Sequence, residues 1–166
     1  MEPLRAAGTN VIEVGVGELA FGQFPSLLMT PALGSCVGFT LWDDVKQRGG
    51  MAHIMLPSAG DSMMKGEPTR FATVAVPMLV DKLVRMGSPV KRLEAKLAGG
   101  SAMFRGDFGM ASIGERNVAE VKAQLDRYGI RPVAEDTGGN HARTIELHLD
   151  TGLLVVRSYL YGIREL

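Results

Sequence analysis

The chain has 166 residues and a formal net charge of zero, with 18 basic and 18 acidic residues. This length predicts one domain, which can bury roughly 70% of its unfolded surface and needs no disulfides to be stable. The balanced charge, without a basic stripe, argues against a nucleic-acid partner. Aromatic residues, at 6% of the chain, are also too few to favour stacking platforms for bases.

The N-terminus and the cysteine content indicate the compartment. Met1 is followed by Glu2 and Pro3 rather than by a basic and apolar leader, and no apolar run approaches the roughly 20 residues of a transmembrane helix. One cysteine cannot form an internal disulfide. We therefore expect a cytoplasmic protein without insertion into a membrane, in which residues 1–10 form a flexible tail and residues 11–166 a single domain.

The first third of the chain alternates between apolar runs and turn residues. Its expected strands are 11–16, 27–30, 36–42 and 50–56. The second of these strands is expected to stop at Pro31, which cannot donate to a ladder. A loop at residues 43–48 then joins the third and fourth strands as an antiparallel pair. Residues 57–68 favour a surface loop.

Two segments have helical periodicity. The first is expected to begin near Thr69, a good N-cap type, and to end at Gly87, with Pro77 kinking it or removing one backbone bond. The second follows a capping-box pattern at residues 112–115 and ends at Gly129. The expected buried faces are Ala72, Val76, Leu79, Leu83 and Met86 in the first helix and Val118, Val121, Leu125 and Tyr128 in the second.

The rest of the chain adds strands. They are expected at 90–97 and 130–134, followed by a hairpin of 143–149 and 153–159. Two long helices are too few to cover both faces of a parallel sheet. The sequence therefore predicts an α/β protein of the α+β type, a layered sandwich of mostly antiparallel strands with two main helices on one side.

Cys36 lies between glycines at positions 34 and 38. A sulfur nucleophile needs a base to remove its proton and an open backbone beside it for the substrate. His53 lies on the strand expected beside that of Cys36. An unperturbed thiol with a pKa near 8.5 is only about 3% thiolate at pH 7, and a nearby imidazole can hold the thiolate as an ion pair.

Plainer interpretations compete with this one. Free cysteine is among the most buried residue types, so Cys36 can be a small core residue, and a lone histidine in an apolar strand is usually structural. A catalytic histidine also needs an acceptor on its second nitrogen. Thr30, through its hydroxyl or its carbonyl, is one candidate for that acceptor, and Asp43 and Asp44 are alternatives.

A metal site is the rival chemistry, built from Cys36, His53, His141 and His148. The histidines at 141 and 148 lack the short spacing of helical zinc ligands, so no metal is expected. Neither Gly99-Gly100 nor Gly138-Gly139 is surrounded by a phosphate-loop pattern, and no cofactor is expected.

Several runs of sequence carry a family resemblance. They are Leu33-Gly34-Ser35-Cys36-Val37-Gly38, Gly50-Met51-Ala52-His53-Ile54-Met55-Leu56-Pro57, Leu93-Glu94-Ala95-Lys96-Leu97-Ala98-Gly99-Gly100-Ser101-Ala102-Met103-Phe104, Ile113-Gly114-Glu115-Arg116-Asn117 and Glu135-Asp136-Thr137-Gly138-Gly139-Asn140. Together they resemble the chemoreceptor glutamine deamidases of the CheD family, in the family's order and over nearly the whole chain.

This resemblance implies a site and a fold. It places the nucleophile at Cys36, the histidine base at His53 and the third catalytic residue at Thr30. It also implies a sandwich similar to the catalytic domain of cytotoxic necrotizing factor toxins. Two residues depart from the family pattern: Pro31 follows Thr30, and Phe71 stands where a tyrosine is expected.

The resemblance further implies the substrate and the partners. Specific glutamine side chains of methyl-accepting chemotaxis receptors would be hydrolysed to glutamate through a cysteine thioester, and glutamyl methyl esters are a related substrate. The phosphatase CheC is an implied partner. We expect the backbone amides near Ser35 and Val37 to stabilise the oxyanion, in a shallow groove bordered by the 57–68 loop. The alternative function is an adaptor that binds receptors or CheC without turnover.

Overall fold

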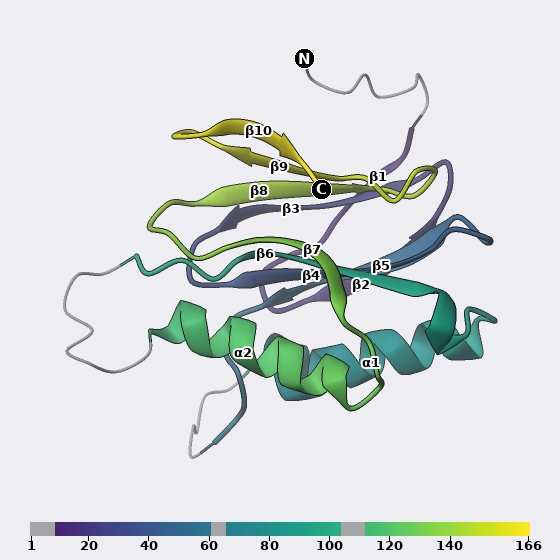
Figure 1. The fold of residues 1–166 in the computed structure, drawn as a ribbon, viewed down its shortest axis with the longest axis horizontal. Helices are drawn as coiled ribbons and strands as arrows, with labels where there is room; N and C mark the ends of the chain where they lie inside the picture. The colour runs from purple at the N-terminus through teal and green to yellow at the C-terminus, as the bar shows by residue number, and fades with distance from the viewer. Residues whose placement is uncertain (1–8, 61–65, 104–111) are drawn as a thin grey trace.

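The computed structural model describes residues 9–60, 66–103 and 112–166. Two five-stranded sheets lie one above the other, and two helices cover the outer face of one of them (Figure 1). Six of the described strand pairings are antiparallel, whereas β1 with β3 and β6 with β7 are parallel. The expected α+β sandwich of mostly antiparallel strands is therefore confirmed.

The two sheets mix strands from distant parts of the chain. The first sheet has the order β1 (Val11–Glu13), β3 (Leu27–Leu33), β8 (Arg143–His148), β9 (Leu154–Ser158) and β10 (Gly162–Glu165). The second has the order β2 (Leu19–Gln23), β5 (Arg48–Ile54), β4 (Val37–Asp43), β6 (Leu93–Gly99) and β7 (Pro132–Thr137). The expected antiparallel neighbours over 36–42 and 50–56 are β4 and β5, and the expected hairpin is β8 and β9.

The helices are α1 (Ala72–Arg85) and α2 (Ile113–Asp126), preceded by short 3₁₀ turns η1 (Pro68–Arg70) and, before β6, η2 (Val90–Arg92). The capping box at α2 is confirmed in its main bond, because the Ser112 hydroxyl accepts from the Glu115 N–H at 3.1 Å. The expected start of α1 at Thr69 is wrong. Thr69 lies in η1 and its hydroxyl donates to Gly17 O at 2.6 Å, so the hydroxyl is not available to cap a helix.

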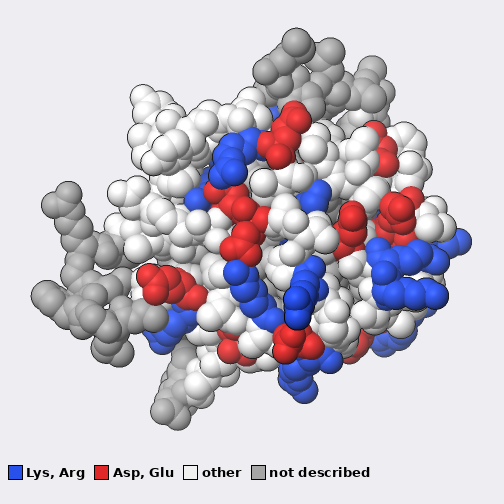
Figure 2. All heavy atoms as spheres, in the orientation of Figure 1, with Lys and Arg blue, Asp and Glu red and all other residues white. Residues whose placement is uncertain are grey.

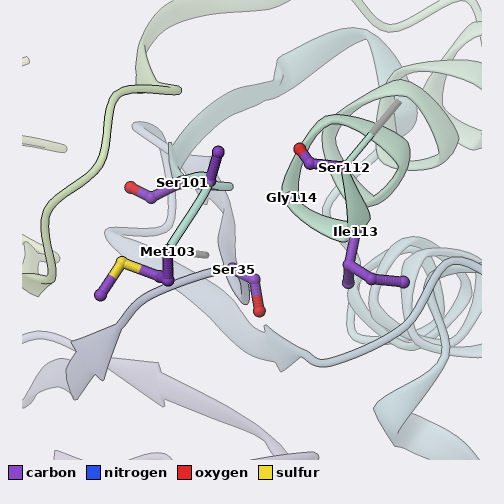
Figure 3. Close-up of a pocket in the computed structure, with 7 residues that line it drawn as sticks. Ser35, Ser101, Met103, Ser112, Ile113 and Gly114 are labelled. Atoms are coloured by element: carbon purple, nitrogen blue, oxygen red, sulfur yellow. The ribbon is translucent and has the colours of Figure 1, made fainter. Parts of the chain in front are cut away.

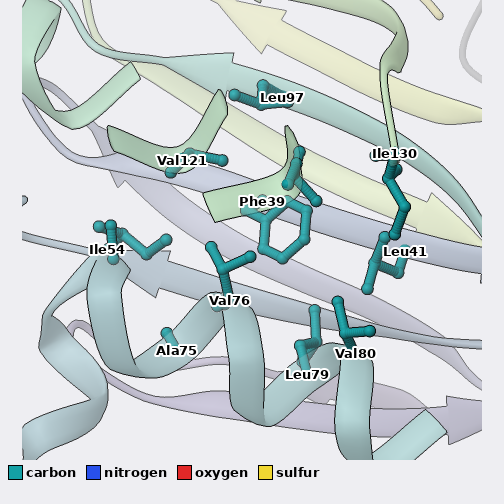
Figure 4. Packing of buried hydrophobic residues seen from close by; sticks show 14 of the residues in the cluster. Phe39, Leu41, Ile54, Ala75, Val76, Leu79, Val80, Leu97, Val121 and Ile130 are labelled. Atoms are coloured by element: carbon teal, nitrogen blue, oxygen red, sulfur yellow. The ribbon is translucent and has the colours of Figure 1, made fainter. Parts of the chain in front are cut away.

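One core fills the space between the helices and the second sheet. Phe39 and Leu41 of β4 point at α1 and α2, where they meet Val76, Leu79 and Val121 (Figure 4). The expected buried face of α1 is confirmed except at Met86, which lies beyond the helix and is exposed. Alternation along β4 and β5 therefore directs every second side chain toward the helices.

A second core lies between the two sheets. Leu28 of β3, Met51 of β5 and Ile145 of β8 belong to it, and Cys36 packs against it. Gly38 of β4 faces this layer so closely that a Cβ there would collide with Ile145. Residues of β4 and β5 that do not face the helices therefore face β3 and β8, and this layer is where the candidate site forms.

The expected strands differ from the observed strands at several positions. The strand from Leu27 does not stop at Pro31, because β3 continues to Leu33 through an irregularity between Thr30 and Leu33 in which Ala32 has a φ of 58°. Such a bulge accommodates a proline, which has no N–H to pair. The sequence-based interpretation also omitted β2 and β10, and it began β6 three residues early, where η2 lies.

The surface carries both signs of charge. In Figure 2, Lys and Arg lie next to Asp and Glu across the face that it shows. Arg92 forms an ion pair with Asp43 at 2.9 Å, and Arg143 pairs with Asp136 at 3.3 Å. Among the described residues, no helix combines the length and the apolar character needed to cross a membrane. Residues 1–8 of the expected tail and residues 61–65 of the expected groove border lie outside the described ranges.

Candidate active site

Cys36 and His53 lie at the same end of the second sheet. Cys36 immediately precedes β4, and His53 is the penultimate residue of β5. The ladder pairs Gly38 with His53, so Cys36, two residues before Gly38, is the diagonal neighbour of His53 on the same face. Both side chains face the layer between the sheets. Cys36 is half-buried and His53 is 1% exposed.

Thr30 reaches His53 from the other sheet. Its hydroxyl lies 2.7 Å from His53 Nδ1 and 2.6 Å from Val14 O, and Thr30 is fully buried. The contact is through the hydroxyl and not the carbonyl of Thr30. Pro31 does not prevent it, because the irregularity in β3 begins only after Thr30. The carboxylates of Asp43 and Asp44, the alternative acceptors, lie at the opposite end of β4.

These two short contacts determine which ring nitrogen of the neutral His53 carries the proton. A threonine hydroxyl has one proton, and a backbone carbonyl can only accept. The Thr30 proton therefore goes to Val14 O, so the Thr30 oxygen must accept from His53 Nδ1–H. The lone pair of neutral His53 is then on Nε2. This nitrogen is buried and has no hydrogen-bond partner among the described residues, Cys36 included.

Burial shifts both pKa values toward the neutral forms. It lowers the pKa of His53 to about 4 and raises the pKa of the Cys36 thiol. The resting pair in this conformation is therefore a thiol beside a neutral imidazole rather than a thiolate–imidazolium ion pair. A neutral imidazole with a free lone pair is suited to accept a proton.

The loop before β4 is held by its carbonyl groups. Ser101 N–H donates to Gly34 O at 2.9 Å and Gly100 N–H donates to Cys36 O at 2.9 Å. Between them, the Asn117 side chain donates to Ser35 O at 3.0 Å. Three consecutive carbonyls thus accept from the two residues that follow β6 and from α2, which leaves little freedom in the backbone beside the thiol.

A small cavity adjoins this loop. It has a volume of about 100 Å³ and lies between Ser35, the strand extension at residues 101–103 and the start of α2 at residues 112–114. Figure 3 shows the Ser35 side chain between Met103 and Ile113, with Ser101 and Ser112 above them in this view. Pockets for small molecules usually measure roughly 300 Å³ or more. This cavity therefore fits the tip of a side chain better than a whole small molecule.

The structure brings together most of the site residues that were expected from the sequence. Thr30 and His53 are hydrogen-bonded, Cys36 is their neighbour, and Ser35 lines the cavity. Asn117 is the residue whose role sequence reasoning missed, although it closes one of the family-like runs. Within the described ranges, no three His, Cys, Asp or Glu side chains are grouped so as to hold a metal ion.

The chain is therefore a layered α+β protein in which a cysteine lies beside a buried histidine–threonine pair. A family model described as CheD chemotactic sensory transduction matches residues 55–158. A chemoreceptor glutamine deamidase CheD from Thermotoga maritima is 48% identical over 144 residues, which is 87% of this chain and 89% of the relative. The chain belongs to the CheD family.

Other relatives extend the match to almost the full chain. A probable chemoreceptor glutamine deamidase CheD from Desulfitobacterium hafniense is 43% identical and covers 93% of this chain and 97% of its own. One from Pyrococcus abyssi is 42% identical, at 93% and 95%. Among solved structures, the Bacillus licheniformis hypothetical protein YfiH matches with a TM-score of 0.49 at 14% identity, over 77% of this chain and 59% of that chain. The expected likeness to cytotoxic necrotizing factor toxins stays a prediction.

Proposed function

We propose that this protein deamidates glutamine side chains of chemoreceptors and that Cys36 is its nucleophile. The observation that carries the proposal is the buried His53, whose Nδ1 is engaged by Thr30 and whose Nε2 lone pair is free on the face that it shares with Cys36. Membership of a family whose relatives are named chemoreceptor glutamine deamidases supports chemoreceptor glutamines as the substrate.

Acylation begins with transfer of the thiol proton. His53 Nε2 takes the proton of Cys36 as sulfur bonds to the side-chain carbonyl carbon of the glutamine, and the carbonyl oxygen becomes an oxyanion. Catalytic hydrogen bonds often tighten only when substrate is bound, which accounts for an Nε2 without a partner in the free protein. The Thr30 oxygen then stabilises the imidazolium through Nδ1–H.

Backbone amides of the cysteine loop are the candidates for the oxyanion hole. The Gly100 N–H donates to Cys36 O, and the alternation of an antiparallel ladder then directs the Val37 N–H toward β5. Among the amides near Ser35 and Val37, this favours those of Ser35 and Cys36, which have no acceptor among the described backbone groups. One such donor is worth roughly 3 kcal/mol in the transition state.

Collapse of the tetrahedral species completes the first half. His53 donates its proton to the departing nitrogen, the C–N bond breaks, ammonia leaves, and a thioester to the receptor remains. Water, deprotonated by neutral His53, then attacks the thioester, so that glutamate is released and the Cys36 thiol is restored. The cycle uses no cofactor. A glutamyl methyl ester passes through the same thioester with methanol as the leaving group.

Peptide mass spectrometry of a receptor cytoplasmic fragment tests the proposal. The wild-type protein should add about one dalton at defined glutamines, because NH2 is exchanged for OH, and Cys36→Ala should add none. A Cys36→Ala variant that converts the same glutamines at the wild-type rate would contradict the proposal. Binding of the fragment by both proteins without any mass change would favour the adaptor alternative.

The same fragment and purified CheC test the partner. If CheC is a partner, it should bind this protein directly and change the rate of deamidation. If the two proteins sediment as separate species and the rate of deamidation is unchanged, CheC is not a partner. The deamidase proposal is unaffected by that result.

A further inference from the structure

The strands that carry Cys36 and His53 part directly at the site. Val37 and Ile54 are the last pair of the ladder between β4 and β5. If the ladder continued, Leu56 N–H would donate to Ser35 O two residues further on. Instead, Leu56 N–H donates to Arg70 O at 3.2 Å, and Leu56 O accepts from Ala72 N–H at 3.0 Å. Beyond β5, the backbone therefore pairs with the segment that leads into α1 instead of with β4. As a result, Ser35 O has no hydrogen-bond donor from the β5 side.

Asn117 lies at the point where β4 and β5 separate. It projects from α2, is fully buried, and donates from one Nδ2 amide group to two carbonyls, Ser35 O at 3.0 Å and Met55 O at 3.0 Å. Ser35 precedes Cys36 by one residue, and Met55 follows His53 by two. One side chain therefore ties the cysteine loop to the histidine strand at the point where their backbones no longer bond to each other.

We propose that Asn117 is a positioning residue that sets the Cys36 backbone amide and the spacing between Cys36 and His53. A peptide group is planar and trans, so its N–H points opposite to its carbonyl. When Asn117 holds Ser35 O, the Cys36 N–H of the same peptide is directed away from α2. This inference rests on the proposed deamidase function, because it assigns that N–H to the oxyanion.

A purely structural role explains Asn117 poorly. Its Oδ1 is buried without a hydrogen-bond partner among the described residues, and an unsatisfied buried acceptor lowers stability. The neighbouring contact between α2 and the sheet is already made by close backbone packing, since a Cβ on Gly114 would collide with the Gly100 and Ser101 carbonyls. What Asn117 adds is a pair of donors aimed at the two strands of the site.

Two substitutions at Asn117 distinguish the effect of losing its N–H donors from the effect of losing its side-chain volume. Asn117→Ala removes both, whereas Asn117→Asp keeps the size and removes the two N–H groups. Both variants should lower kcat for the receptor fragment by tenfold or more and leave KM within twofold, because the substrate still binds to a misaligned site. Gln124→Ala is the matched control, since Gln124 is a buried amide of the same helix that donates to Glu120. Its kcat should stay at the wild-type value.

Hydrogen exchange gives a readout that needs no receptor. In both Asn117 variants, the amides of residues 33–38 should exchange at least tenfold faster than in the wild type and in Gln124→Ala, whereas those of β8 should not change. This result decides the inference even if the wild-type protein does not deamidate the fragment. Variants with the wild-type kcat and wild-type exchange at residues 33–38 would overturn it.

A measurement on the unaltered protein covers the case in which neither variant folds. If both Nδ2 protons of Asn117 are held by carbonyls, they should exchange with solvent at least 100-fold more slowly than those of a free side-chain amide, as followed by NMR. Exchange at the rate of a free amide would overturn the inference.

Discussion

The Thr30 hydroxyl is the group that decides how His53 can act. It gives its proton to Val14 O and therefore accepts from Nδ1–H of the imidazole. In the proposed mechanism it takes the place that a carboxylate has beside the histidine of many hydrolases, but without a negative charge in a buried layer. A neutral acceptor suits an imidazole that is itself neutral at rest.

Replacing Thr30 tests whether its hydroxyl orients His53. Thr30→Val keeps the shape and removes the hydroxyl, so it leaves His53 Nδ1–H without an acceptor and frees the ring to take the wrong tautomer. Deamidation should fall roughly 10- to 100-fold, as measured by ammonia release, and Thr30→Ser should keep most of the activity. A Thr30→Val protein that is as active as Thr30→Ser would show that the hydroxyl does not orient the base.

At the scale of elements, the end of β6 shapes the cysteine loop. Gly99 has a φ of 105°, and a Cβ at this position would collide with Cys36 O. Gly100, the next residue, donates to that same oxygen. Only a glycine at position 99 lets β6 approach the loop closely enough for this bond, so the Gly99-Gly100 pair of the sequence allows β6 to pack against the cysteine loop.

The variant Gly99→Ala should therefore lose both stability and activity. A positive φ costs an alanine about 1–3 kcal/mol, and the collision adds to this cost. Gly162→Ala is the control, because Gly162 also has a positive φ, of 70°, but no atom of the described residues lies within 4 Å of the position that its Cβ would take. Thermal denaturation should show the larger loss for Gly99→Ala, and only that variant should lose deamidation. Equal losses of stability and of deamidation in the two variants would mean that backbone strain alone explains the effect of Gly99→Ala.

The elements that sequence reasoning recovered are those with strong local signals. The period of α1 and α2, the capping box at Ser112 and the hairpin of β8 and β9 are local patterns. The start of α1 was misplaced because Thr69 has a tertiary partner in Gly17 O. The continuation of β3 past Pro31 depends on pairing with β8, more than 100 residues away in the chain, which no local pattern reveals.

The candidate site shows the same division. The spacing of Cys36 and His53 on neighbouring strands followed from the apolar runs and the turn between them. The contact of Thr30 with His53 joins two different sheets. The residues alone left Thr30, Asp43 and Asp44 as possible acceptors, and the family resemblance favoured Thr30. The role of Asn117 depends on where β4 and β5 part, which is a property of the assembled sheets.

For the whole molecule, His53 links the site to folding stability. It lies in the layer between the sheets, and burial lowers its pKa to about 4, from an ordinary value of 6.5. The unfolded chain therefore binds a proton at a higher pH than the folded protein. Stability contributed by neutral His53 is present above pH 6.5 and is lost as the pH falls from about 6.5 to about 4, by up to roughly 3 kcal/mol.

Denaturation between pH 7 and pH 4 checks this linkage. The wild-type free energy of unfolding should fall more steeply over this range than that of His53→Gln, which has no proton to bind at this position. The two curves should become parallel above pH 7. Equal slopes throughout would mean that His53 has an ordinary pKa and is not desolvated in the folded protein.

Trapping with hydroxylamine detects the proposed thioester between Cys36 and the receptor glutamine. Hydroxylamine attacks a thioester in competition with water, so the receptor fragment should acquire hydroxamates, about 16 daltons heavier than glutamine, at the same positions that are otherwise deamidated. Cys36→Ala should give neither product. Deamidation by the wild-type protein without any hydroxamate, or hydroxamate formation by Cys36→Ala, would contradict acyl transfer through Cys36.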